Sequence, residues 1–376
     1  MKMVVRFSLW LALLALGAAT ALAQDETEDS DVESSLALIW ELVSDQPQDV
    51  GIGCVPLNEP DRAVFYNADE PFPLASVSKL LIFIEYARRV DIGEISWSET
   101  VDVAVLDRYN LPRTDRGAHD RFMTQYPPDI QQIYLSELAI GMMQYSSNAA
   151  SDYLLDRLAP VDWASLYRSL SISHTDPPHS LTMIPLLMNN HETGKAGLRD
   201  IPSLSIETGE RLLDLYVSDE AWREDEIEYR SGRGSQFPIW SIQAAILEAD
   251  TASGTVRDFL SILRLLYTPG VTNGLSENVK AATRSALRWI GNPYIDERYA
   301  AYGSKLGFYS GGTLTLVAYG DPLLGDPVLS AVFFRDIPRR TYNFLLEEDA
   351  IGHLAHWMNF NGCAGLADAI ADAVGL

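Results

Sequence analysis

The chain has 376 residues, with 52 acidic side chains against 28 lysines and arginines, and its formal net charge is −24. A negative charge of this size disfavours binding to nucleic acid or to anionic membrane surfaces. The length is sufficient for one large domain, or for two subdomains around a substantial core.

The N-terminus has the pattern of a secretory signal peptide. Lys2 and Arg6 precede the apolar stretch FSLWLALLALGAAT, and Ala21-Leu22-Ala23 supplies the small residues of a cleavage site. We therefore predict a signal peptide over residues 1–23, an exported chain that is periplasmic or secreted, and no membrane anchor in the mature chain. The acidic run over residues 24–33 is expected to be a disordered leader.

The apolar pattern then predicts a helix, a hairpin and a long helical region. SSLALIWELVSD has apolar residues at helical spacing, and DVGIGCVPL and RAVFYNAD are strand-like runs separated by the turn sequence NEPD. From residue 75 to about residue 279, several segments carry an apolar stripe with a 3.6-residue period.

After residue 280 the pattern changes to strands. YAAYGSKLGFYS, GTLTLVAYGD and DPVLSAVFFRD alternate or run apolar between turn residues, and LLEEDAIGHLAHWMNF closes as a helix. Strands at both ends of the chain predict an α+β fold, in which an antiparallel sheet is flanked by helices and an all-helical subdomain is inserted. We expect one domain over 34–360, with a sheet subdomain (34–74 and 280–360), a helical subdomain (75–279) and a C-terminal tail (361–376).

Ser76 and Lys79 lie three residues apart at the start of a predicted apolar helix, on one face of it. After residue 23 the chain contains few lysines, and they are Lys79, Lys195, Lys280 and Lys305. Lys79 is either an ordinary residue whose stem covers the core or a base that activates Ser76 as a nucleophile.

A catalytic site around Ser76 and Lys79 would need two further groups: a proton donor for the leaving group and a cation that complements the developing negative charge. Ser146 and Asn148 lie at a junction between predicted helices, and Lys305 lies on a predicted strand before Gly307. Each residue also has a structural interpretation: Ser146 as a helix cap, Lys305 as a strand-edge charge and Gly307 as a bulge. The three pieces in this order favour the catalytic interpretation.

The set Ser76-x-x-Lys79, Ser146-x-Asn148 and Lys305-Leu306-Gly307 resembles the motifs of class A β-lactamases and penicillin-binding proteins. The resemblance covers roughly residues 34–360, apart from residues 201–250. It implies a serine hydrolase fold with Ser76 as nucleophile and Lys79 as base.

The resemblance also assigns the remaining roles. Lys305, as a second nearby cation, would help to keep the Lys79 amine neutral. Ser146 would relay a proton toward the leaving nitrogen, and Asn148 would hold the substrate and Lys79 in place. The backbone N–H groups of Ser76 and Phe308 would form the oxyanion hole, with Gly307 allowing close approach. We expect Ser76 Oγ and the Lys79 amine to lie within hydrogen-bond reach.

The sequence departs from the class A pattern where a loop glutamate activates water for deacylation. The corresponding position falls near Leu181, and the nearest acids, Asp176 and Glu192, lie in segments that do not match. Without that carboxylate, an acyl-enzyme is expected to persist.

Two smaller departures concern binding of the substrate. Leu306 replaces a hydroxyl residue that binds the substrate carboxylate, although Arg288 or Arg335 could supply an anion contact. Ser147 replaces an aspartate of structural role.

Two cysteines, Cys54 and Cys363, allow a disulfide in an exported chain, and two buried thiols are the alternative. In the fold that the resemblance implies, the C-terminal helix packs on the sheet that contains Cys54, so the two residues could pair. His353 and His356 lie three apart, but no metal-ligand spacing is present. We expect no metal and no cofactor.

Three functions remain open from the sequence. The first is a class A-type serine hydrolase that is acylated at Ser76 by β-lactams or related amides and is slow to deacylate. The second is a penicillin-binding-protein-like peptidase or esterase, and the third is a non-catalytic binding protein. In each case the partner is a small-molecule or peptide amide or ester, and the protein is expected to be a monomer.

Overall fold

The computed structural model describes residues 33–232, 237–268, 270–271, 274–289 and 291–375. The expected signal peptide and the leader up to residue 32 lie outside these ranges. A helix over 33–45 begins the described chain, as its apolar spacing predicts.

The centre of the fold is a five-stranded antiparallel sheet with the order β2-β1-β11-β10-β9. Its strands are β1 (Val50–Pro56), β2 (Val64–Tyr66), β9 (Tyr299–Tyr309), β10 (Thr313–Pro322) and β11 (Val328–Phe334). The sheet is therefore built from both ends of the chain, as expected. Every residue of β11 is buried, which fits its place in the middle of the sheet.

Short strand pairs lie outside the sheet. Among the described residues they are β3 (Phe72–Pro73) with β8 (Ser253–Gly254), β4 (Thr100–Asp102) with β5 (Gln132–Tyr134), and β6 (Asn189–Asn190) with β7 (Gly194–Lys195).

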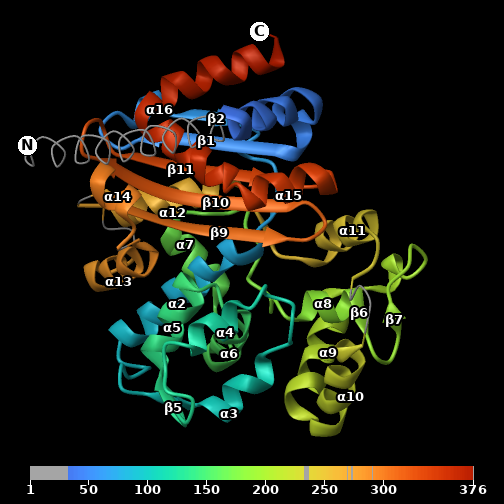
Figure 1. The fold of residues 1–376 in the computed structure, drawn as a ribbon. Coiled ribbons are helices and arrows are strands. Elements are labelled where there is room, and N and C mark those ends of the chain that lie inside the picture. The colour runs from blue at the N-terminus through green and yellow to red at the C-terminus, as the bar shows by residue number, and fades with distance from the viewer. Residues whose placement is uncertain (1–32, 233–236, 269, 272–273, 290, 376) are drawn as a thin grey trace, which may run out of the picture.

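Helices cover both faces of the sheet (Figure 1). One face is covered by the helix over 33–45 and by α15 (Arg339–Glu347) and α16 (Ala350–Val374). The opposite face is covered by α12 (Val256–Tyr267), and the rest of the helical region follows beyond it.

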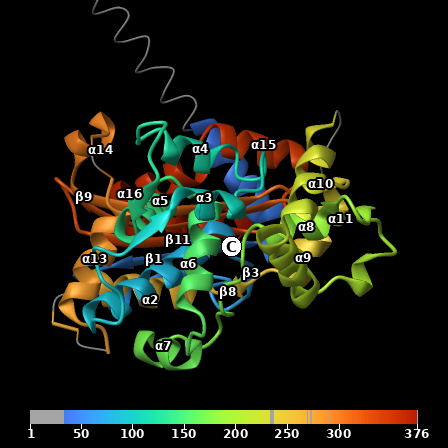
Figure 2. The same cartoon turned by 90° about the horizontal axis from the view of Figure 1, so that it is seen from below.

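The helical region contains the remaining described helices. They are α2 (Lys79–Asp91), α3 (Val103–Leu106), α4 (Ala118–Met123), α5 (Leu135–Gln144), α6 (Asn148–Leu158), α7 (Trp163–Leu170), α8 (Met183–Met188), α9 (Ile206–Ser218), α10 (Glu220–Ser231), α11 (Trp240–Asp250), α13 (Glu277–Leu287) and α14 (Pro293–Arg298). Figure 2 shows that α8–α11 lie together at one end of the molecule, to the side of α2, α6 and α7. The segment 201–250, which the sequence resemblance leaves unmatched, thus forms a helical unit with its own apolar cluster.

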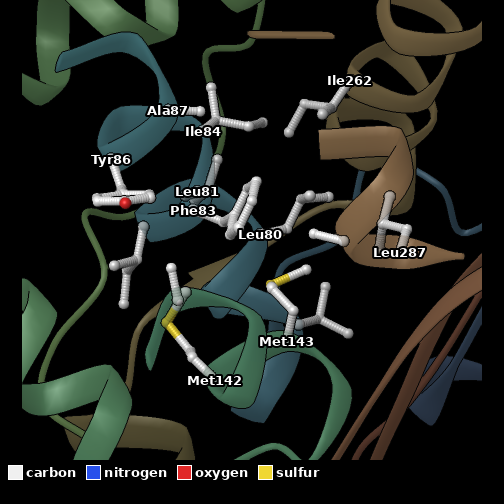
Figure 3. Close-up of a cluster of buried hydrophobic side chains, with 14 of the residues drawn as sticks. Leu80, Leu81, Phe83, Ile84, Tyr86, Ala87, Met142, Met143, Ile262 and Leu287 are labelled. Atoms are coloured by element: carbon white, nitrogen blue, oxygen red, sulfur yellow. The ribbon is translucent and has the colours of Figure 1, made fainter. Parts of the chain in front are cut away.

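Helix α2 is the central element of the helical region. Almost every side chain of α2 is buried, including Leu80, Leu81, Phe83 and Ile84. Figure 3 shows these residues packed against α5, which contributes Met142 and Met143, and against Ile262 and Leu287. This packing fixes the position of the first residue of α2, Lys79.

The expected C-terminal tail belongs to the fold as far as residue 375, where the described chain ends. Helix α16 continues to Val374, with a break at Gly362, whose φ is 69°. Cys363, Leu366 and Ile370 beyond the break are buried in the core. The apolar spacing of these residues is interrupted by Gly362, which is why the closing helix was expected to end earlier.

Cys54 of β1 and Cys363 of α16 form a disulfide, with their Cα atoms 5.4 Å apart. The bond joins the sheet to the second half of α16 and closes a loop of 309 positions. Among the described residues, no helix is both long enough and apolar enough to cross a membrane.

Candidate active site

Ser76 lies in a 3-10 turn, η3 (Ala75–Ser78), directly before α2. The turn is tied to the sheet, because Thr315 Oγ1 of β10 donates a hydrogen bond of 2.8 Å to the Leu74 carbonyl oxygen. Ala75 has φ of 47°, a left-handed conformation that costs a non-glycine residue about 1–3 kcal/mol. A strained and anchored turn therefore presents Ser76, which is half-buried and lines a cleft of about 480 Å³.

Lys79 is completely buried below Ser76, and its amine points to the junction between α5 and α6. Nζ donates to the Ser146 carbonyl oxygen (2.6 Å), to Asn148 Oδ1 (2.8 Å) and to Ser146 Oγ (3.2 Å). No hydrogen bond joins Lys79 to Ser76, in contrast to the expected contact, because Ser146 and Asn148 accept the protons of the amine.

Ser146 also has a left-handed backbone, with φ of 65°, and this conformation directs both its carbonyl and its hydroxyl toward Lys79. The next residue, Ser147, is the N-cap of α6: its Oγ accepts the N–H of Ala150 and lies 2.9 Å from His119 Nδ1. Ser147 is therefore structural, as expected.

Lys305 enters the cleft from β9 and is 4% exposed. Its Nζ donates to Ser146 Oγ at 3.0 Å and to the Leu306 carbonyl oxygen at 3.2 Å. One hydroxyl thus connects the two amines, and Ser76, Ser146, Asn148 and Lys305 all line the same cleft.

Both amines have a lowered pKa. Burial holds the pKa of Lys79 well below its usual value, and the nearby charge of Lys305 lowers it further. Burial lowers the pKa of Lys305 to about 7. A neutral amine beside a hydroxyl can act as a general base near neutral pH.

Gly307 allows β9 to pass beside the serine turn. A Cβ at this position would lie 2.8 Å from the Ser76 backbone nitrogen and 2.8 Å from the Leu74 carbonyl oxygen. Only glycine fits so close an approach. Phe308, the next residue, lines the cleft, and the Arg116 guanidinium lies 5.6 Å from the centre of its ring.

A sequence model described as the beta-lactamase enzyme family matches residues 37–288, well over half of the chain. The chain belongs to the beta-lactamase enzyme family.

Solved β-lactamases have the same fold. A β-lactamase from Sphaerobacter thermophilus is 16% identical, covers 89% of this chain and 97% of its own, and superposes with a TM-score of 0.54. An ancestral (GNCA) class A β-lactamase is 17% identical, covers 86% of this chain and 99% of its own, and has a TM-score of 0.52. At these identities the likeness shows the α+β β-lactamase fold. No curated protein matches the sequence significantly.

In this β-lactamase-family cleft, Leu181 lines the wall beside Ser76. Its position is fixed by Asp152, which lies one helical turn after Asn148 on α6. The Asp152 carboxylate accepts the backbone N–H of Leu181 (2.8 Å) and that of Thr182 (2.9 Å). Burial raises the pKa of Asp152 to about 6, although these hydrogen bonds oppose the increase.

Among the described residues that line the cleft, Asp115 is the only carboxylate. Both of its oxygens are occupied, because they accept the backbone N–H groups of residues 117–119 at the start of α4. Asp176 accepts hydrogen bonds from Ser253, and Glu192 accepts one from Trp222 Nε1; neither lines the cleft.

Of the two arginines that were candidates for binding the substrate carboxylate, one lines the cleft and the other does not. Arg288 lines the cleft, together with Arg121, which the sequence did not indicate. Arg335 lies elsewhere: it donates to Asp49 and to backbone carbonyls, and its guanidinium lies over the Phe72 ring.

Sequence reasoning also missed Asp152 and Thr315. Asp152 carried a usable signal, since it follows Asn148 by four positions and therefore shares its helix face. Thr315 gave none, because threonine is common in strands of any function.

Proposed function

We propose that the protein is an exported serine hydrolase that forms an acyl-enzyme at Ser76 with β-lactams or related amides. The observation that carries this proposal is the pair of buried amines, Lys79 and Lys305, that share the Ser146 hydroxyl in the cleft that Ser76 lines. Two buried amines destabilise a fold, so their presence together at this cleft disfavours a purely binding role.

In the proposed reaction, the neutral Lys79 amine turns from its present acceptors, Ser146 and Asn148, toward Ser76. Ser76 Oγ then attacks the amide carbonyl carbon while its proton passes to this amine. The carbonyl oxygen becomes an oxyanion, stabilised by the N–H groups of Ser76 and Phe308. The C–N bond then breaks, the leaving nitrogen takes a proton from the Lys79 ammonium through Ser146 Oγ, and an ester of Ser76 remains. Asn148 holds both the substrate and Lys79, and Arg288 or Arg121 binds an anionic group of the substrate.

Deacylation is proposed to be slow. Leu181 presents an apolar side chain beside Ser76, and the only carboxylate of the described cleft lining, Asp115, is fully engaged by backbone N–H groups. The described lining therefore offers no free carboxylate to activate water. The lack of a free carboxylate in the described lining also favours the second candidate, a penicillin-binding-protein-like peptidase or esterase. In such an enzyme the acyl group would be transferred from Ser76 to an acceptor other than water.

Intact-mass spectrometry after incubation with benzylpenicillin tests the proposal. We expect a stable adduct of one penicillin on the wild type and none on Ser76→Ala. Rapid hydrolysis without an adduct would show an efficient β-lactamase and contradict slow deacylation. Neither adduct nor hydrolysis, with penicillins and with activated esters, would favour a binding protein.

A further inference from the structure

A second cavity of about 370 Å³ lies on the opposite face of the catalytic strand β9. It is bounded by α14 and α16, which lie beside β9 and above it in Figure 1. Tyr302, Ser304 and Leu306 of β9 line it, and Ser304 and Leu306, with Trp289, also line the catalytic cleft that Lys305 enters. The two cavities therefore adjoin at the edge strand β9, and this rear cavity has no role in the proposed reaction.

The walls of the rear cavity are aromatic. The Tyr302 and His356 rings are stacked with their centres 4.7 Å apart, and the Tyr294 ring meets His356 edge-on at 5.1 Å. Trp289 stands at the mouth and is 49% exposed. Burial, with the nearby His353 and Arg298, lowers the pKa of His356 to about 4, so its ring is neutral at physiological pH. The Arg298 guanidinium already lies over the Tyr294 ring, 4.1 Å from its centre, so the exposed ring of Trp289 is the face that a ligand cation can reach. Neutral aromatic faces attract cations.

The polar groups of the cavity are mainly acceptors. Glu348 and Asp349 lie at its rim, and neither forms an ion pair with a described residue. His353 Nδ1 is buried and has no hydrogen-bond partner among the described residues. A buried ring nitrogen without a partner costs about 1–3 kcal/mol, which a donor on a ligand would recover.

We propose that the rear cavity binds a small organic cation, namely an ammonium or guanidinium group on an aromatic or apolar body. The cation donates hydrogen bonds to Glu348, Asp349 and His353 Nδ1, and its body packs between Tyr302 and Trp289. A metal ion fits less well, because no group of three or more His, Cys, Asp or Glu in the described chain is arranged to hold one. An anion would face the two carboxylates.

Isothermal titration of the full-length protein with benzylamine, which is a cation at pH 7, tests the proposal. Benzyl alcohol and benzoate have the same body without the positive charge. We expect saturable one-site binding of benzylamine, at least tenfold weaker binding of the alcohol and none of benzoate. Equal binding of amine and alcohol, or no binding of the amine at millimolar concentration, would overturn the proposal.

Binding measurements on variants test whether benzylamine binds in the rear cavity. The double change Glu348→Gln and Asp349→Asn removes both carboxylates, and asparagine tolerates the left-handed backbone of residue 349, whose φ is 48°. We expect at least tenfold weaker binding in this variant, but unchanged binding in Glu297→Gln, which removes an exposed charge from α14. Unchanged binding in the double variant would refute the assignment. Ser76→Ala should bind benzylamine normally, so this result does not depend on the proposed acylation.

Discussion

Lys305→Met should make the protein more stable while abolishing acylation. Lys305 is 4% exposed, and burial lowers its pKa from 10.5 to about 7. At about 1.4 kcal/mol per tenfold change in proton affinity, the buried amine costs about 4 kcal/mol of folding free energy at pH 7. Methionine has similar length and no charge, but it loses the hydrogen bonds to Ser146 and Leu306, each worth about 0.5–1.5 kcal/mol. The expected net gain is about 2 kcal/mol.

The pH dependence of the stability difference between Lys305→Met and the wild type tests whether the buried amine is its cause. Between pH 7 and 10.5 the unfolded chain binds a proton at Lys305 that the folded chain does not, so wild-type stability rises with pH and the advantage of Lys305→Met shrinks. Below pH 7 both states are protonated and the advantage is largest. Urea unfolding of the oxidised protein at pH 6, 8 and 10 measures this, with the exposed Lys195→Met as control. If the variant were less stable than the wild type at pH 6, or if the difference did not change with pH, the cost assigned to the buried amine would be wrong.

Gly307→Ala should lower the rate of acylation at least 100-fold, because its Cβ would displace the Ser76 N–H of the proposed oxyanion hole; a normal rate with a fluorescent penicillin would exclude that hole. Leu181→Glu should accelerate loss of the acyl group, whereas Leu181→Gln, of the same shape, should not; equal decay of the two adducts by mass spectrometry would argue against a missing carboxylate as the cause. Reducing the Cys54–Cys363 bond should destabilise the fold by about 4–5 kcal/mol. Thermal unfolding with and without reductant measures this, and the Cys54→Ser, Cys363→Ser double variant should not respond.

The sheet and the catalytic motifs were predictable because they follow local rules. The strands of the sheet alternate or run apolar between turn residues, and the motif residues Ser76, Lys79 and Lys305 stand at fixed places on regular elements. The three-motif order predicted that Lys305 and Ser146 face the cleft of Ser76; all three line one cleft, and Lys79 is buried behind it with its amine bound to Ser146. The hydrogen bond expected between Ser76 and Lys79 is absent, because spacing along a helix does not reveal competing acceptors on another element.

Helix α10 shows why the segment 201–250 was harder to interpret. Its sequence EAWREDEIEYRS reads as a solvated, highly charged face. In the structure Glu226 and Arg230 are buried and paired, and Trp222 of the same helix is buried as well. A buried ion pair reverses the usual relation between charge and exposure, so an apolar stripe cannot locate such a helix.

The place of β11 in the sheet also sets an order of events during folding. β1 leads the chain, yet its partner on the inner side is β11, which begins only at Val328. The helices between them can form from local contacts, whereas the sheet needs residues that are made last, and such distant pairings form slowly. A chain that stops before Val328 lacks the middle strand rather than an edge. Its β1–β2 and β9–β10 hairpins would then have no common sheet to join, and their apolar faces would remain open to aggregation.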